Sequence, residues 1–139
     1  MRQALELAAA AGARGDEPFG AVLTHGDTEL LDASNAVETG NDIALHPELT
    51  LARAAAHHPD ADQLVLYTST EPCSMCAGGI AIAGLGGVVF SVSATRAREL
   101  AGERGHVAPA GTVLDRLDET PVIGGVLEAK GAAIHRAYW

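Results

Sequence analysis

Aromatic and basic residues are scarce in this chain of 139 residues. Aromatic side chains make up 4% of it, and 9 Lys and Arg stand against 18 Asp and Glu, a net charge of −9 at pH 7. A domain that binds nucleic acid normally has the opposite balance, because phosphate contacts supply most of its affinity. Nucleic acid is therefore disfavoured as a partner.

Cysteine and long hydrophobic runs are also rare. Cys73 and Cys76 are the only thiols, too few for a disulfide framework, so the pair is metal-binding, redox-active or incidental. Residues 77–90 form an apolar stretch, but it contains five glycines and is shorter than the roughly 20 residues of a membrane span. Glu6 interrupts what would have to be the apolar part of a signal peptide. We expect a cytoplasmic protein without a membrane segment.

The length and the 47% hydrophobic content favour one domain over residues 1–139, with a core of its own. Helical and extended patterns alternate along it. The expected helices are 2–14, 47–56, 72–83 and 125–139, with short ones within 95–117; the expected strands are 19–24, 28–33, 64–67, 87–91 and 121–123, and the expected loops include 34–42 and 68–71. This order predicts an α/β fold, a three-layer α/β/α architecture with a mixed central sheet of about five strands.

Three short pieces carry the chemistry: His46-Pro47-Glu48, Thr70-Glu71-Pro72-Cys73 and Cys73-Ser74-Met75-Cys76. Cysteines three apart share a helix face and can bind one ion, and the positive end of the helix dipole favours their thiolates. Because a residue before proline avoids the α region, His46 is expected to cap its helix. One nitrogen and two sulfurs make a catalytic zinc set with a position left for water, which Glu48 could reach. A thioredoxin-like thiol switch is the alternative for the two cysteines.

His46-x-Glu48 followed by Pro72-Cys73-x-x-Cys76 resembles the signature of the zinc-dependent cytidine and nucleobase deaminase superfamily. The resemblance covers most of the chain in order, and is strongest to the small guanine and nucleoside deaminases and the tRNA adenosine deaminases. The stretches that carry it are 18–22, 34–35, 41–42, 67–78 and 88–90.

The resemblance implies a cytidine deaminase-like fold, a homodimer and one zinc ion per chain, held by His46, Cys73 and Cys76. It implies hydrolytic deamination, in which the zinc-bound water has a pKa lowered toward about 7. Glu48 would take a proton from that water, pass it to a ring nitrogen and then protonate the departing ammonia. Loss of Glu48 should leave zinc bound and abolish catalysis.

Four further residues are candidate substrate contacts: Asn35, Phe19, Pro47 and Glu71. Asn35 is a candidate by resemblance, Phe19 belongs to the core or the pocket wall, and Glu71 caps the next helix or supports a ligand. The family usually has alanine at the position of Pro47, with its N–H facing the base; because proline has no N–H, a substrate carbonyl must find another donor or be absent. The remaining histidines show no ligand spacing and are expected at the surface: His25, His57, His58, His106 and His135.

The charge also separates the possible substrates. A tRNA adenosine deaminase needs a basic surface for its anticodon loop, and this acidic chain has one lysine, Lys130. We expect a small amino-heterocycle, a free nucleobase (guanine-like first) or its nucleoside, with tRNA adenosine deamination as the alternative. A non-catalytic zinc-stabilised binding module would need a fourth protein ligand, and there is no third cysteine to supply it.

Overall fold

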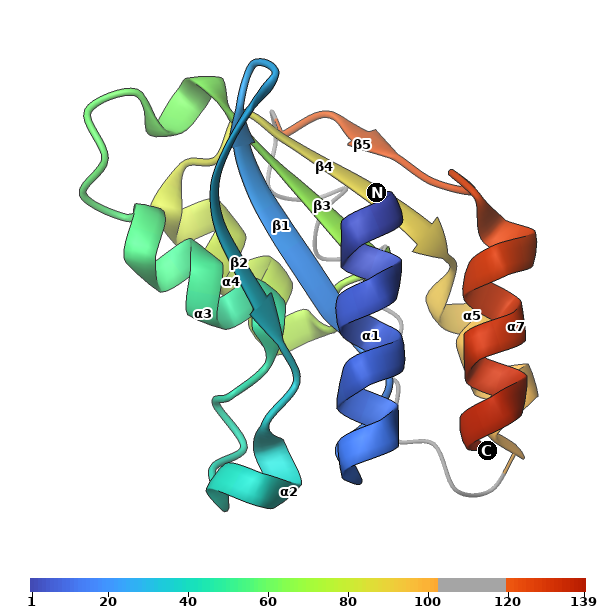
Figure 1. The fold of residues 1–139 in the computed structure, drawn as a ribbon. Coiled ribbons are helices and arrows are strands. Elements are labelled where there is room, and N and C mark those ends of the chain that lie inside the picture. The colour runs from blue at the N-terminus through green and yellow to red at the C-terminus, as the bar shows by residue number, and fades with distance from the viewer. Residues whose placement is uncertain (103–119) are drawn as a thin grey trace.

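The structure, a computed structural model, describes residues 1–102 and 120–139 and has a five-stranded sheet at its centre. The strands are β1 Gly20–His25, β2 Thr28–Ser34, β3 Leu64–Thr70, β4 Gly87–Val92 and β5 Val122–Ile123, in the spatial order β2-β1-β3-β4-β5 (Figure 1). β1 runs antiparallel to β2 and β3, whereas β3, β4 and β5 are parallel. The predicted mixed sheet is confirmed.

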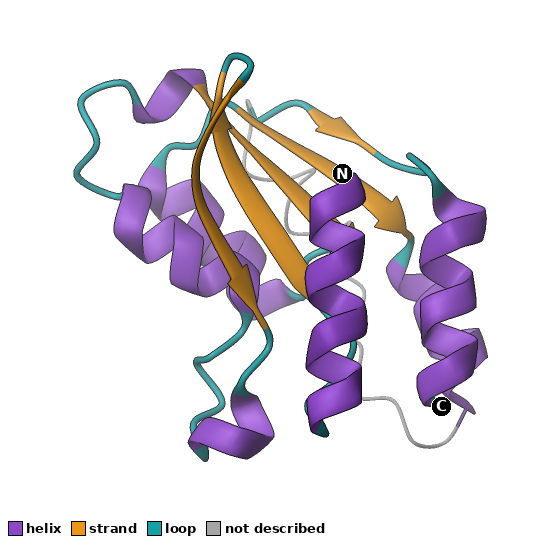
Figure 2. Ribbon diagram, viewed as in Figure 1, coloured by secondary structure: helices purple, strands orange, loops and turns teal. Residues whose placement is uncertain are grey.

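Helices cover both faces of this sheet. The helices of the described residues are α1 Arg2–Arg14, α2 Val37–Gly40, α3 Pro47–Ala55, α4 Ser74–Ala83, α5 Ala94–Ala101 and α7 Glu128–Tyr138, with a 3-10 turn at Ala61–Gln63. α1 and α7 pack on one face, and α3 and α4 on the other (Figures 1 and 2). The predicted α/β class is thereby confirmed. Within residues 1–102 and 120–139, no helix has both the length and the apolar character needed to cross a membrane.

The main core lies between the sheet and the pair α3 and α4. Its largest fully buried side chains are Leu23, Leu51, Leu64, Leu66, Ile80 and Val88. α3 and α4 approach closely at Gly79, where a Cβ atom would lie 2.6 Å from Leu49 Cδ1. Because glycine has no side chain, it lets the two helices lie side by side. This close packing brings together the ligands predicted at their N-termini.

Two predicted loops differ in the structure. Residues 34–42 contain the short helix α2. Residues 68–70 belong to β3, because Thr68 and Thr70 pair with Phe90 and Val92 of the neighbouring strand β4. α5 is the described part of the helical region predicted within 95–117, since 103–119 lie outside the described residues.

Asp16 is a buried carboxylate that ties α2 to the end of α1. Its Oδ1 accepts hydrogen bonds from the backbone N–H groups of Glu38 and Thr39, both at 3.0 Å. Its Oδ2 accepts from Arg14 Nε and from the Thr39 hydroxyl, both at 2.9 Å. Burial alone would raise the Asp16 pKa, but the hydrogen bonds from Thr39 and Arg14 outweigh it and lower the pKa from its ordinary value of 3.8. This long-range network stabilises α2.

We expect Asp16→Asn to lower the free energy of unfolding by about 1–3 kcal/mol, because an amide cannot accept from all four donors. The folded-state pKa of Asp16 is depressed, so its contribution is present above pH 3.8 and is lost as the pH falls through the lower folded-state value. Urea unfolding at neutral pH and at successively lower pH should show the gap between wild type and Asp16→Asn narrowing. The exposed Asp32→Asn is the matched control, and equal stability of the two variants at neutral pH would contradict the prediction.

Candidate metal centre and active site

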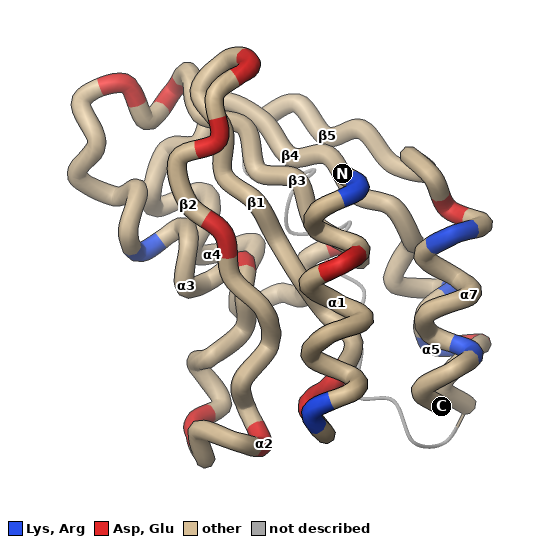
Figure 3. Tube along the Cα trace, viewed as in Figure 1, with Lys and Arg blue, Asp and Glu red and all other residues tan. Residues whose placement is uncertain are grey.

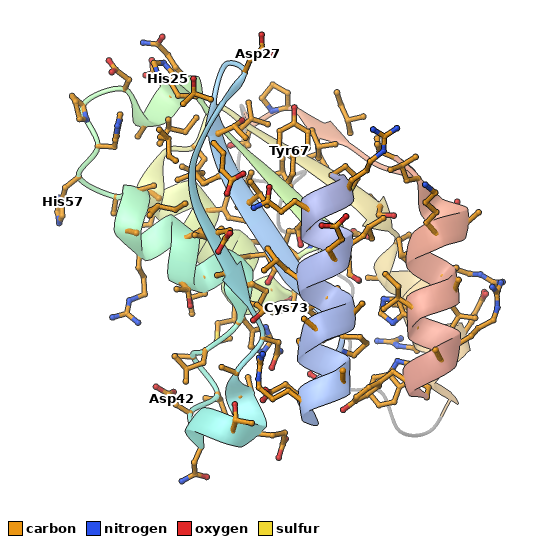
Figure 4. All side chains as sticks on the ribbon, in the orientation of Figure 1. His25, Asp27, Asp42, His57, Tyr67 and Cys73 are labelled. Atoms are coloured by element: carbon orange, nitrogen blue, oxygen red, sulfur yellow. The ribbon has the colours of Figure 1, made fainter. Side chains whose placement is uncertain are left out.

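Three possible metal-ligand atoms converge where α3 and α4 begin. His46 caps α3 with an extended backbone (φ −71°, ψ 135°), Cys73 caps α4, and Cys76 lies in the first turn of α4. His46 Nδ1 lies 3.7 Å from Cys73 Sγ and 3.5 Å from Cys76 Sγ, and the two sulfurs are 3.5 Å apart. Figure 4 labels Cys73 at this point in the fold. The structure thus brings the three predicted ligands together.

The arrangement of these atoms fits zinc. Tetrahedral zinc with Zn–S bonds of about 2.3 Å and a Zn–N bond of about 2.0 Å places its ligand atoms about 3.5–3.8 Å apart. The three separations here, 3.5, 3.5 and 3.7 Å, match that requirement. Among residues 1–102 and 120–139, no further His, Cys, Asp or Glu joins the cluster. The described ligands therefore leave one tetrahedral position for water or substrate.

The two thiols have opposite pKa shifts. The hydrogen bond from the Cys76 thiol, helped by His46, lowers the pKa of Cys73 to about 4 against the effect of burial. The pKa of Cys76 is raised because its thiol donates a hydrogen bond to Cys73 and because the side chain is buried. The bond to Cys73 raises the pKa of His46, although burial opposes it. The cluster therefore already holds one thiolate, and a divalent cation would stabilise both.

Glu48 lies beside the cluster and is not part of it. Its side chain is buried; Oε1 accepts from the Thr68 hydroxyl at 2.5 Å, and Oε2 lies 3.6 Å from Cys76 Sγ. Burial raises the Glu48 pKa, while the Thr68 hydrogen bond opposes this shift. A carboxylate that adjoins a metal site with an open position is placed to exchange protons with a ligand there.

Thr68 is a functional candidate that sequence reasoning missed. Its hydroxyl lies 2.5 Å from Glu48 Oε1 and 3.0 Å from the Thr70 carbonyl oxygen. The hydroxyl can donate to an ionised Glu48. It can also accept from a protonated Glu48 while donating to the carbonyl. Thr68 therefore suits both protonation states of the carboxyl group.

We expect Thr68→Val to reduce ammonia release about 10-fold or more, because a hydrogen bond to a charged group is worth about 1.5–3 kcal/mol. Zinc content should stay unchanged, since Thr68 does not contact the ligand atoms in the described network. Steady-state kinetics and metal analysis measure both. Thr68→Ser keeps the hydroxyl and is the control; equal loss in the Ser and Val variants would show that packing, not the hydroxyl, matters.

A cavity opens beside the cluster, lined by Glu17, Phe19, His46, Glu48, Thr70, Glu71 and Cys73. Two of the predicted substrate contacts, Phe19 and Glu71, thus line it, whereas Asn35 and Pro47 are not among its lining residues. Glu71 does not cap the helix that follows Pro72, contrary to one expectation. Its Oε2 accepts from the Ala94 backbone N–H at 2.8 Å and caps α5 instead, because parallel pairing of β3 and β4 brings the two positions together.

Asn35 and Pro47 are both buried. Asn35 Oδ1 accepts from the Val37 N–H at 3.0 Å, and its Nδ2 has no hydrogen-bond partner within the described part of the chain. Arg14 Nη2 donates to the Asn35 carbonyl oxygen at 2.6 Å, which fixes the backbone there. Pro47 is buried at the first position of α3.

His135 corrects another expectation, because it is buried and only 1% exposed. Its Nε2 lies 2.9 Å from the hydroxyl of Thr70, which lines the cavity. Burial lowers the His135 pKa to about 4, so its ring is neutral at neutral pH. The sequence carried no signal for this contact, since 65 positions separate the two residues. His106 lies outside the described residues.

Comparison with known proteins agrees with this geometry. Residues 1–92 match the model of the cytidine and deoxycytidylate deaminase zinc-binding region. A probable cytosine deaminase of Schizosaccharomyces pombe is 27% identical over 146 aligned positions, covering all of this chain and 90% of that protein. A guanine deaminase of Bacillus subtilis is 40% identical over 85 positions, 59% of this chain and 54% of that protein.

The fold is shared with solved structures. A tRNA:A34 deaminase, an enzyme of A-to-I editing at the wobble position of transfer RNA, superimposes with a TM-score of 0.71 at 27% identity, covering 96% of both chains. The match to the family model spans the stretch that holds all three candidate ligands, and zinc is the metal of that family. The chain therefore belongs to the cytidine and deoxycytidylate deaminase family, whose members are zinc-dependent hydrolases of C–N bonds.

Proposed function

We propose that this enzyme hydrolytically deaminates a small amino-heterocycle, a free nucleobase (guanine-like first) or its nucleoside. The observation that carries the proposal is the placement of the buried Glu48 against the His46, Cys73 and Cys76 cluster. The guanine and cytosine deaminases among its relatives support a base as substrate.

The charge around the cavity supports a ligand without phosphate. Three carboxylic residues, Glu17, Glu48 and Glu71, line the cavity, and no Lys or Arg is among its described lining residues. Acidic side chains also predominate over basic ones along the trace (Figure 3). Anionic groups near a site disfavour a second anion at short range.

In the proposed reaction, His46, Cys73 and Cys76 would hold the zinc ion. When bound, zinc lowers the pKa of water toward about 7 and supplies hydroxide at neutral pH. Glu48 accepts the proton released from water and donates it to the ring nitrogen next to the amine-bearing carbon. The water oxygen would add to that carbon, and Glu48 would take the second proton from the resulting C–O–H group and pass it to the amine, so that the C–N bond breaks to give the oxo product and ammonia. Thr68 holds the Glu48 carboxyl group during both transfers.

Ammonia release tests this function. Zinc-loaded protein is offered guanine, cytosine, adenine, 2,6-diaminopurine and the corresponding nucleosides, and zinc is counted per chain. We expect about one zinc per chain and ammonia from at least one compound. Zinc-loaded protein that releases none from any compound would overturn the small-molecule assignment.

A second candidate is deamination of adenosine in tRNA, and the full-length structural match to a tRNA:A34 deaminase favours it. Its test uses a transfer RNA with adenosine at the wobble position. Conversion of that adenosine to inosine, together with tRNA binding that persists at physiological salt, would favour tRNA over the free base as the substrate. We expect neither, because the net charge is −9.

We also propose that the protein is a cytoplasmic homodimer. A reducing compartment keeps two liganding thiols free. α4 has no charged residue and exposes Met75 and Ile82 (39% and 89%), an apolar surface that a second copy could cover. Light scattering should give the mass of two chains, and a stable monomer at micromolar concentration would exclude the dimer.

A further inference from the structure

A chain of hydrogen bonds connects α7 to the cavity. Trp139 Nε1 lies 3.4 Å from His135 Nδ1, and His135 Nε2 lies 2.9 Å from Thr70 Oγ1. His135 and Thr70 are 1% and 2% exposed, and Thr70 lines the cavity. The mechanism above uses none of these three side chains.

The chemistry of the three groups determines which atom donates and which accepts in each hydrogen bond. An indole N–H only donates, so Nδ1 of His135 is the acceptor of the Trp139 hydrogen bond. A neutral imidazole then carries its proton on Nε2 and donates it to Thr70 Oγ1. Burial, which lowers the His135 pKa to about 4, keeps the ring neutral. The Thr70 hydroxyl is thus an acceptor toward His135, and its own proton is left for another partner.

The surroundings of His135 hold it in this position. Its ring packs against the ring of Phe19, another cavity-lining residue, with 5.8 Å between centroids. Gly131, one turn earlier in α7, lets the helix lie against β4, because a Cβ there would come within 2.7 Å of Ser91 Oγ. His135 is therefore placed by packing on two sides.

The cavity has few groups that can donate to a ligand. Its described lining side chains are three carboxylates (Glu17, Glu48, Glu71), the apolar Phe19, two candidate metal ligands (His46, Cys73) and Thr70. Ionised carboxylates only accept hydrogen bonds, and the proton that Glu48 carries in the proposed reaction goes to the ring nitrogen beside the amine-bearing carbon. Thr70 is accordingly the one neutral hydroxyl donor among the described lining side chains. Amino-heterocycles carry ring-nitrogen and oxo acceptors that need such a donor when water is displaced.

We propose that Trp139 and His135 are positioning residues that orient the Thr70 hydroxyl as a hydrogen-bond donor to a ring-nitrogen or oxo acceptor of the bound amino-heterocycle. The class of ligand rests on the proposed function. The orientation of the hydroxyl rests on the contacts alone. Thr70 would thus help to determine which heterocycles bind in a productive orientation.

Binding measurements on zinc-loaded protein test the Thr70 contact. The probes are guanine and its 3-deaza and 7-deaza analogues, each of which replaces one ring-nitrogen acceptor by C–H. Thr70→Val should bind guanine about 3- to 10-fold more weakly, the worth of one neutral hydrogen bond, and Thr70→Ser should restore much of the affinity. If the acceptor is a ring nitrogen, one analogue should bind wild type and Thr70→Val equally; if it is the oxo group, 2,6-diaminopurine should do so.

Nitrogen NMR of the His135 ring tests the other two residues without a ligand. Wild type should show the Nε2–H tautomer, and Trp139→Phe should shift it toward Nδ1–H because the indole donor is gone. The control is Tyr138→Phe, which alters the ring next to Trp139 (4.7 Å between the centroids of Tyr138 and Trp139). It should leave the tautomer of His135 unchanged. A merely structural role for Trp139 would not move this signal.

Three results would overturn the inference: an Nδ1–H tautomer in wild type, equal affinities of Thr70→Val and Thr70→Ser for every probe, or no binding of any probe to wild type. An unchanged tautomer in Trp139→Phe would remove Trp139 from it. Ammonia release from the panel of bases and nucleosides named under the proposed function tests that function separately. Deamination without any Thr70 effect contradicts this inference alone, and probe binding with the Thr70 effect but without deamination contradicts the proposed function alone.

Discussion

Glu48→Gln should give a folded protein with its zinc content intact that releases ammonia about 10²–10⁴ times more slowly than wild type. Glutamine keeps the size of the side chain and can still accept from the Thr68 hydroxyl. An amide cannot take up and return a proton near neutral pH, however, so both proton transfers lose their carrier. The corresponding rise in the activation barrier is about 3–5 kcal/mol.

The stability of this variant separates catalysis from folding. Glu48 is 4% exposed, and its burial raises the carboxyl pKa, so the ionised form is costly in the folded state. A neutral amide removes that cost, and urea unfolding should show a free energy of unfolding equal to or higher than that of wild type. Kinetics, metal analysis and unfolding are measured on the same preparation.

The control is Glu38→Gln, the same substitution at an exposed position of α2. It should keep activity within about twofold, as expected for a surface change away from the site. If Glu48→Gln retained activity within 10-fold of wild type while holding zinc, Glu48 would not be the proton carrier, and another group on the cavity wall would have to be found.

The metal site was predictable from the sequence because its geometry is local. Proline after His46 forces an extended backbone at that residue, which became the cap of α3. Cys73 and Cys76 belong to one helix start, so their spacing alone places both sulfurs on one side. What the sequence could not give is the distance between the two helix starts. That depends on packing of α3 against α4 through Gly79.

Features that depend on distant partners were missed or misread. α2 forms where a loop was expected because Asp16 accepts the N–H groups of Glu38 and Thr39. Thr68 and Thr70 look like loop residues by composition, but β4 pairs with them. His135 lacks any ligand spacing, yet α7 buries it against Thr70. In each case a tertiary contact outweighs the local propensity.

Cys76→Ser should lose zinc binding, and with it catalysis and part of the thermal stability. A serine hydroxyl is not an anionic ligand at neutral pH, so one of the three candidate protein ligands disappears. Metal that binds only the folded chain stabilises it by about 2.7 kcal/mol when free zinc is 100 times its dissociation constant. For a chain of this size the melting temperature of wild type should rise by roughly 10 °C on adding zinc. That of Cys76→Ser should not.

Chelation provides the same test in the unaltered sequence. Removing zinc from wild type should abolish ammonia release and lower the melting temperature, and adding zinc back should restore both. Ser74→Ala, an exposed change in the same turn of α4, is the control and should respond to zinc as wild type does. An equal zinc response in Cys76→Ser and wild type would show that the ion binds elsewhere.

Proton release on zinc uptake tests whether Cys76 binds the ion as a thiolate. Cys73, with a pKa of about 4, is already a thiolate at neutral pH, whereas the pKa of Cys76 is raised. Zinc must therefore displace the Cys76 proton, and uptake in weakly buffered solution should release at least one proton per ion. Zinc affinity should accordingly rise with pH across the neutral range. Uptake without proton release would mean that Cys76 does not bind the ion as a thiolate, and the assignment of this sulfur as a ligand would fail.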